Sequence, residues 1–107
     1  MNDEAAIIAF LNTQIEQQEI RPYILVRPSI KCGNGLSMSI QANSFCYCSP
    51  RSDTGPWTHF EIGFPSKPVE ELLPYIDMSG SNPIDAVYKQ VPIDLIVRII
   101  IANGGLA

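Results

Sequence analysis

Five side chains that can bind an anion or a flat ring lie within thirteen positions of one another, in the middle of the chain. They are Tyr47, Ser49, Arg51, Trp57 and His59. Arginine presents its N–H donors in a planar fork that matches a phosphate or a carboxylate, and serine adds a hydroxyl. Aromatic rings stack on nucleobases. The combination predicts a ligand-binding site for a small nucleotide.

The same stretch has plainer interpretations. Residues 49–56 contain two prolines and a glycine, so they form either a binding loop between two strands or an ordinary hairpin turn. In the plainer case Arg51 pairs with Asp53 or Glu61 at the surface, an interaction worth little to stability.

Catalytic and metal-binding patterns are weak. The chain has one histidine and no phosphate-loop, dinucleotide or zinc-protease motif. A nucleophilic couple of Cys46 or Cys48 with His59 lacks a third group to orient the histidine. The spacing of Cys32, Cys46, Cys48 and His59 does not match the usual zinc ligand spacings. We therefore expect no enzyme activity, no cofactor and no metal, and cysteines that pack as small apolar side chains.

Composition limits the class of protein. With 107 residues, 46% hydrophobic and 17% charged, residues 1–107 fit a single globular domain. The formal net charge of −4 disfavours long nucleic acids, whose binding needs clustered Lys and Arg, but leaves a single phosphate site open. An odd number of cysteines and an acidic start predict a reducing cytoplasm. No apolar run approaches the roughly 20 residues of a membrane span.

Hydrophobic periodicity predicts the elements that position the site. Helical spacing predicts helices over residues 3–17, capped by Asn2 or Asp3, and from Pro92 to Gly104-Gly105. Alternation predicts strands over 36–42 and from Trp57 to Phe64, and a strand over 23–32 that Pro28 interrupts. A helical turn is expected at 69–73, a loop at 79–83, and a turn through Val87 and Tyr88 capped by Asn82. This order predicts an α+β domain: a small antiparallel sheet with an N-terminal helix and C-terminal helices packed on it.

The register of the strand after the loop predicts which of its side chains are exposed. Phe60, Ile62 and Phe64 alternate and are expected to face the core. Trp57 and His59 then point away from the core on the opposite face. An exposed tryptophan beside a histidine favours contact with a ligand or a partner.

The last helix is apolar on almost every side. Ile93, Ile96, Val97 and Ile100 form one face, while Leu95, Ile99 and Ile101 lie off it. A domain this small has a limited interior, so a second subunit is expected to cover Ile99 and Ile101. The sequence thus predicts a homo-oligomer.

The segments SMSIQANSFCYCSPRSDTGPWTHFEIGFPS and VYKQVPIDLIVRIIIANGG resemble a family of small bacteriophage proteins. The shared pattern includes Tyr-Cys-Ser-Pro-Arg, Gly-Pro with an aromatic residue, Glu-x-Gly-Phe-Pro-Ser and a C-terminal Val-Pro helix ending in Gly-Gly. The resemblance covers residues 36–107 and leaves the N-terminal helix, residues 1–19, outside. Cys46 and the N-terminal extension depart from the pattern.

The resemblance implies a phage accessory protein that antagonises host immunity in the bacterial cytoplasm. The leading expectation is a protein that sequesters a host-defence signalling nucleotide of the cyclic kind. One alternative is a protein-binding inhibitor of a host defence complex, comparable to an anti-CRISPR protein, whose acidic face occupies a basic channel. Another is a phage structural or assembly subunit.

Overall fold

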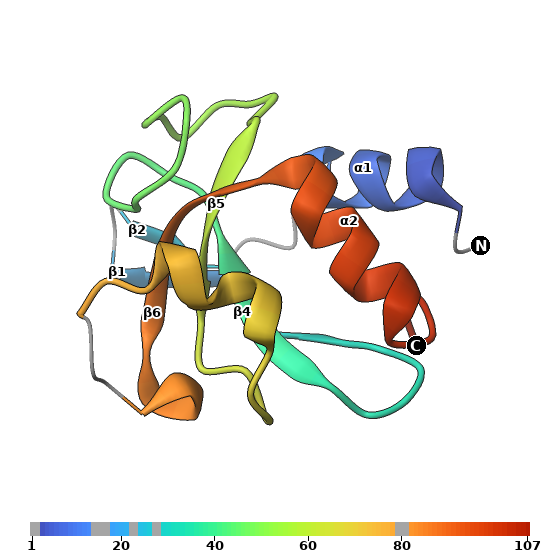
Figure 1. Cartoon of the computed structure of the whole chain (residues 1–107). Helices are drawn as coiled ribbons and strands as arrows, with labels where there is room; N and C mark the ends of the chain where they lie inside the picture. The colour runs from blue at the N-terminus through green and yellow to red at the C-terminus, as the bar shows by residue number, and fades with distance from the viewer. Residues whose placement is uncertain (1–2, 14–17, 22–23, 27–28, 79–81) are drawn as a thin grey trace.

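The computed structural model describes residues 3–13, 18–21, 24–26, 29–78 and 82–107. In chain order the elements are α1 (Glu4–Thr13), β1 (Gln18–Arg21), β2 (Ile24–Val26), β3 (Ile30–Lys31), β4 (Ser37–Gln41), β5 (His59–Gly63), the 3-10 helices η1 (Glu70–Tyr75) and η2 (Pro83–Asp85), β6 (Val87–Pro92) and α2 (Ile93–Ala102). Strands β3 to β6 form an antiparallel sheet in sequence order, and β1 and β2 form a separate antiparallel hairpin. The predicted α+β class is confirmed (Figure 1).

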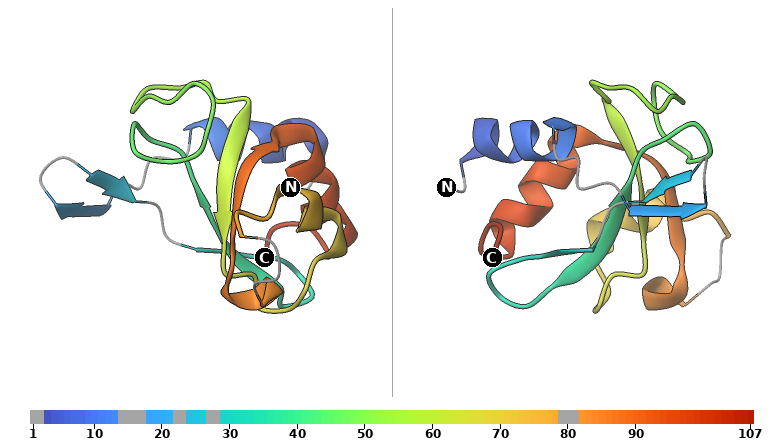
Figure 2. Two further views of the ribbon diagram at one scale, coloured as in Figure 1. Left: turned by 60° about the vertical axis from the view of Figure 1, so that its left-hand side comes forward. Right: turned by 180° about the vertical axis from the view of Figure 1, so that it is seen from behind.

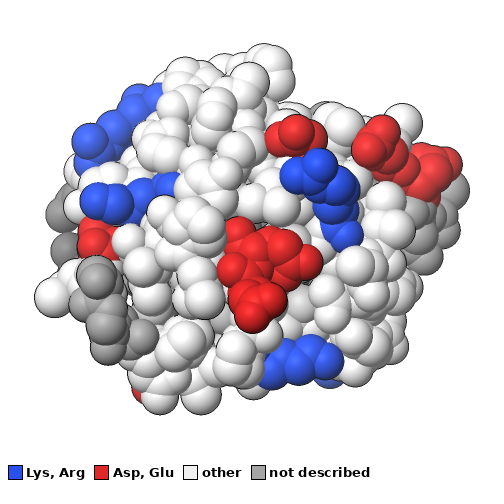
Figure 3. Space-filling view, in the orientation of Figure 1, with Lys and Arg blue, Asp and Glu red and all other residues white. Residues whose placement is uncertain are grey.

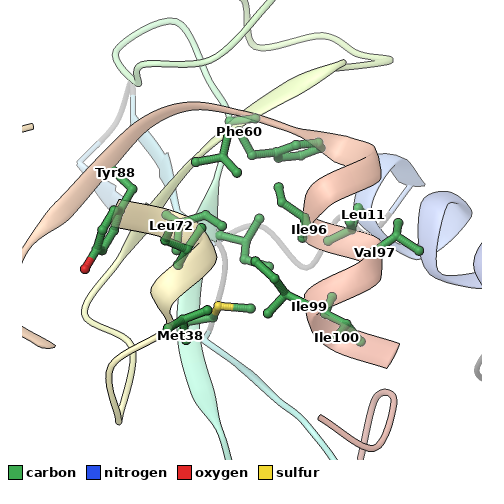
Figure 4. Packing of buried hydrophobic residues seen from close by; sticks show 14 of the residues in the cluster. Leu11, Met38, Phe60, Leu72, Tyr88, Ile96, Val97, Ile99 and Ile100 are labelled. Carbon is green, nitrogen blue, oxygen red and sulfur yellow. The ribbon is translucent and has the colours of Figure 1, made fainter. Parts of the chain in front are cut away.

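The helices lie on one side of the four-stranded sheet. The left view of Figure 2 shows α1, α2 and η1 on that side and the β1–β2 hairpin standing away on the other. The core lies between sheet and helices, where Phe60, Leu72 and Ile96 come together (Figure 4). Leu11 of α1 and Val97 of α2 extend this core to the outer helix. Among the described residues, no helix is long and apolar enough to cross a membrane.

Strict alternation predicted the central strands well. On β4 and its flanks the predicted inward residues are all buried: Leu36, Met38, Ile40 and Ala42. On β5, Phe60 and Ile62 are fully buried as expected. The prediction for Phe64 is wrong, because β5 ends at Gly63 and Phe64 adopts a left-handed backbone with φ 51°. The change of backbone region takes its side chain out of the strand register, and 59% of it is exposed.

Strand β6 is the main feature that periodicity missed. Asn82 does cap η2, since its side chain accepts a hydrogen bond from the Ile84 N–H at 3.2 Å, but the chain then pairs with β5 instead of turning. A bulge places two residues of β6, Lys89 and Gln90, between the partners of Phe60 and Ile62. The buried residues Tyr88 and Val91 are therefore three positions apart, and no alternation is visible in the sequence.

The N-terminal third agrees in part with the prediction. Asp3 caps α1 by accepting a hydrogen bond from the Ala6 N–H at 2.8 Å, and the helix is confirmed over Glu4–Thr13. The predicted helical residues 14–17, the alternative cap Asn2 and the predicted break at Pro28 lie outside the described residues. Strand β1 was not predicted, whereas β2 falls within the predicted strand over 23–32.

The two later helices agree better. The 3-10 helix η1 matches the predicted turn at 69–73, and α2 begins after Pro92 and ends before Gly104, which has φ 95°. Residues 79–81 of the predicted surface loop lie outside the described residues. The proposal that Ile99 faces a second subunit is wrong, because Ile99 is 2% exposed within one chain. Helix α2 contacts both β6 and α1, so its own domain covers more than one face.

Candidate functional site

The predicted site loop connects β4 to β5 and is folded back on the start of β5. Ser49 pairs with His59 as an isolated bridge: the Ser49 N–H donates to the His59 carbonyl at 3.1 Å. The Thr58 N–H donates to the Ser49 carbonyl at 2.7 Å. Asp53 accepts a hydrogen bond from the Ser44 N–H at 2.9 Å, which closes the loop across its width. In Figure 1 this loop rises above the sheet at the upper left.

Gln90 of β6 holds the first half of the loop. Its backbone N–H donates to the Tyr47 carbonyl at 3.0 Å, and its Nε2 donates to the Cys48 carbonyl at 2.9 Å. Its Oε1 accepts a hydrogen bond from Ser49 Oγ at 2.6 Å. Glu61 adds a fourth bond by accepting from the Tyr47 N–H at 2.9 Å. Four hydrogen bonds from the neighbouring strands therefore hold residues 47–49.

Two cationic side chains converge on the ring of Tyr47. Arg51 Cζ lies 5.6 Å from the ring centroid and Lys89 Nζ lies 5.4 Å from it, both within the range of a cation–π interaction. The Tyr47 side chain remains 42% exposed. Lys89 Nζ also contacts Asp77 Oδ1 at 3.1 Å, the one ion pair among the described residues. The site thus presents the Arg51 cation and an aromatic ring to solvent, with the Lys89 ammonium beside them in its ion pair with Asp77.

The alternative partners of Arg51 have other contacts. Asp53 and Glu61 each accept a backbone N–H, from Ser44 and Tyr47 respectively. Neither forms an ion pair with Arg51 in the described part of the chain. Arg51 is exposed, and its guanidinium lies over the Tyr47 ring. The described loop therefore lacks the ion pair of Arg51 with Asp53 or Glu61 that was expected for an ordinary hairpin turn.

Trp57 is not an exposed ligand contact, and this prediction is wrong. The side chain is 7% exposed, its Nε1–H donates to the Ser52 carbonyl at 3.0 Å, and its ring lies 6.3 Å from that of Phe60. Its backbone N–H donates to Asn12 Oδ1 on α1 at 2.6 Å. Because β5 begins only at His59, the alternation used to place Trp57 does not extend back to it.

His59 contributes less than expected. It is half-buried, and its Nδ1 lies 2.8 Å from Thr58 Oγ1. Of the five predicted residues, the structure therefore brings Tyr47, Ser49 and Arg51 together and adds Lys89 and Gln90. Neither addition had a local signal, since Lys89 and Gln90 follow the turn expected through Val87 and Tyr88, and Gln90 lies 41 positions along the chain from Ser49 and 42 from Cys48.

The cysteines pack in the interior. All three are free and buried. Cys48 Sγ donates to the carbonyls of Asn43 and Pro50 at 3.2 and 3.3 Å, and burial raises the pKa of its thiol. A raised pKa keeps the thiol protonated, which does not suit a nucleophile. In the described chain, no three His, Cys, Asp or Glu side chains are grouped as metal ligands.

The surface charge is patchy. Figure 3 shows separate groups of Lys and Arg on this face, with an acidic group between them rather than a continuous basic stripe. Cavities of about 360 and about 160 Å³ occur in the described surface, and residues between 68 and 87 line both. The described residues of the site loop line neither cavity, and Asp77, the ion-pair partner of Lys89, lines the smaller one.

No family model, curated protein or solved structure matches the chain. The site is therefore interpreted from its own geometry.

Proposed function

We propose that this chain is a non-catalytic binding protein that takes the phosphate of a small nucleotide at the surface of Tyr47, Arg51 and Lys89. The observation that carries the proposal is the convergence of the Arg51 and Lys89 cations on one exposed ring. A guanidinium binds phosphate through paired N–H donors and an ammonium adds a point charge. The Tyr47 ring supplies a surface on which a base can stack.

The fixed backbone around Tyr47 supports the same proposed function. The backbone on either side of the Tyr47 side chain is held by Gln90 and Glu61, so little ordering remains to be done when a ligand arrives. The formal net charge of the chain is −4, which favours a single nucleotide over a long polyanion.

The resemblance to small phage proteins suggests the biological ligand. A cyclic nucleotide used as a host-defence signal carries both a phosphate and a base, and a protein that binds it tightly silences the signal without chemistry. The protonated, buried thiol of Cys48 agrees with binding rather than catalysis. On this proposal the protein acts in the cytoplasm of the infected bacterium.

The proposal is tested by thermal-shift screening against cyclic dinucleotides, cyclic trinucleotides and cyclic ADP-ribose isomers. A ligand at a hundredfold excess over its dissociation constant stabilises the folded state by about 2.7 kcal/mol, a shift that is easily measured. If none of these ligands shifts the melting temperature, the nucleotide proposal fails.

Matched variants locate the binding. Arg51→Ala should cost on the order of 2–5 kcal/mol of affinity while leaving the melting temperature of the free protein nearly unchanged. Arg51→Lys should restore part of the affinity, because an ammonium lacks the fork. Arg98→Ala makes the same charge change on the exposed side of α2 and should bind normally. If Arg51→Ala and Arg98→Ala lose equal amounts of nucleotide affinity, the loss comes from the change in net charge and not from a contact of Arg51 with the phosphate.

A further inference from the structure

A second surface is formed by the two 3-10 helices, the residues that follow each of them, and Phe64 at the end of β5. Four large apolar side chains are exposed in this part of the chain: Phe64, Leu73, Met78 and Ile84. Met78 is the most exposed of them, at 67%. Of these, Leu73 and Met78 each line a surface cavity, and exposed apolar groups at a cavity mark interaction sites more often than scattered single ones.

Two cavities lie on this surface, and the same two segments line both. The larger, of about 360 Å³, is lined by Pro68, Val69, Glu70, Leu73 and Pro83. The smaller, of about 160 Å³, is lined by Asp77, Met78, Asp85, Ala86 and Val87. Phe64 lies next to the smaller cavity in the backbone, since its N–H donates to the carbonyl of the lining residue Ala86 at 3.0 Å. The docking surface is defined here as residues 68–78 and 83–87 with Phe64.

Carboxylates surround the apolar side chains. Glu70 and Glu71 open η1, and Asp85 ends η2. None of these three forms an ion pair with a described residue, whereas Asp77 is held by Lys89. In Figure 3 an acidic group occupies the middle of the face over the region where Figure 1 places η1. The surface is therefore apolar with an uncompensated negative charge.

We propose that this docking surface binds a basic amphipathic segment of a partner protein. Lys or Arg side chains of the segment lie against Glu70, Glu71 and Asp85, and its apolar side chains enter the two cavities. The charge determines the class of partner, because nucleic acid and anionic membrane are both repelled by these carboxylates. The proposal does not depend on nucleotide binding at Tyr47.

Binding of a fluorescein-labelled helical peptide of Lys and Leu to the whole chain, measured by fluorescence anisotropy, tests this proposal. A labelled peptide of Glu and Leu is the negative control. The double variant Glu70→Gln/Asp85→Asn should weaken binding at least about tenfold, the loss of about 1.4 kcal/mol expected when charge pairs are removed. The matched double Glu4→Gln/Asp94→Asn removes the same charge from the first turns of α1 and α2 and should bind within about twofold of the parent.

The apolar part of the surface needs its own pair of variants. Leu73→Ser should weaken binding of the Lys and Leu peptide, and Ile101→Ser, which changes an equally exposed side chain on α2, should not. Because all these side chains are exposed, the melting temperatures should stay close to that of the parent.

Three results would overturn the proposal. In the first, the Lys and Leu peptide fails to bind. In the second, both double variants weaken binding of the peptide equally, so that the net charge of the chain alone explains the binding. In the third, sedimentation shows a concentration-dependent dimer that Leu73→Ser dissociates, so that a second copy of this chain covers the surface.

Discussion

Ser49 Oγ donates a 2.6 Å hydrogen bond to Gln90 Oε1 across forty-one positions of sequence. The same glutamine reaches the neighbouring Cys48 carbonyl through its Nε2. Gln90 has φ 51°, a left-handed backbone that few residues other than glycine adopt readily. It sits in the bulge of β6, where the extra residue is turned out of the ladder and toward the loop. The position of the site loop thus depends on a distortion of the edge strand.

Two replacements of Gln90 separate the contribution of its side-chain hydrogen bonds to stability from the cost of its left-handed backbone. Gln90→Ala removes the bonds to Ser49 and Cys48 and should lower the free energy of unfolding by about 1–3 kcal/mol. Gln90→Gly removes the same bonds but accepts the left-handed backbone, so it should be more stable than Gln90→Ala by about 1 kcal/mol. Urea unfolding measures both. Parent-like stability of Gln90→Ala would show that the side chain does not hold the loop.

Trp57 and Tyr47 should behave oppositely although both are aromatic residues of one loop. Trp57→Ala empties a buried position beside Phe60 and should cost about 3–5 kcal/mol of stability, comparable to Phe60→Ala. Tyr47→Ala removes a side chain that is 42% exposed and should cost less than about 1 kcal/mol, while it weakens nucleotide binding. Thermal unfolding distinguishes the two. Equal destabilisation would mean that Tyr47 is a structural brace.

Of the two isoleucines predicted to face a second subunit, only Ile101 is exposed. Ile101 is 45% exposed on α2, whereas Ile99 is buried in its own chain. Ile101→Glu should leave the fold intact and split an oligomer formed through α2, while Ile99→Glu should unfold the domain. Light scattering and circular dichroism report the two effects. A parent protein that scatters as an 11.8 kDa monomer at micromolar concentration contradicts the predicted oligomer.

Stability should fall in alkaline solution. Burial raises the pKa of the Cys48 thiol, and it raises those of the Cys32 thiol and the Tyr88 hydroxyl as well. The unfolded thiols ionise near about pH 8.5 while the folded ones stay protonated, so above that pH the unfolded state binds fewer protons and the free energy of unfolding decreases. The stabilisation is complete below that pH and is lost as the pH rises through the folded-state pKa values.

Urea unfolding between neutral and alkaline pH tests this linkage. Cys48→Ala, which has no titrating group at that position, should show a shallower decline with pH than the parent, even though it is less stable at neutral pH. A parallel decline would mean that Cys48 titrates alike in the folded and unfolded states.

Local patterns were sufficient for much of the fold. The cap at Asp3, the alternation through Met38 and Ile40, the cap at Asn82 and the start of α2 after Pro92 each depend on residues a few positions apart. Such features are specified by backbone chemistry and by the period of side chains along one element. For the same reason the gathering of Tyr47, Ser49 and Arg51 on one loop was visible in the sequence.

Tertiary structure alone decided the rest. The bulge at Lys89 and Gln90 breaks the alternation of β6, so pairing with β5 is what makes that segment a strand. That pairing carries Lys89 to the ring of Tyr47, while Asn12 and Ser52 hold Trp57 inside. The contacts of Lys89 with Tyr47 and of Asn12 with Trp57 join positions distant in sequence. They form only when the folded chain brings these positions together and pairs its buried polar groups, so no local period of the sequence predicts them.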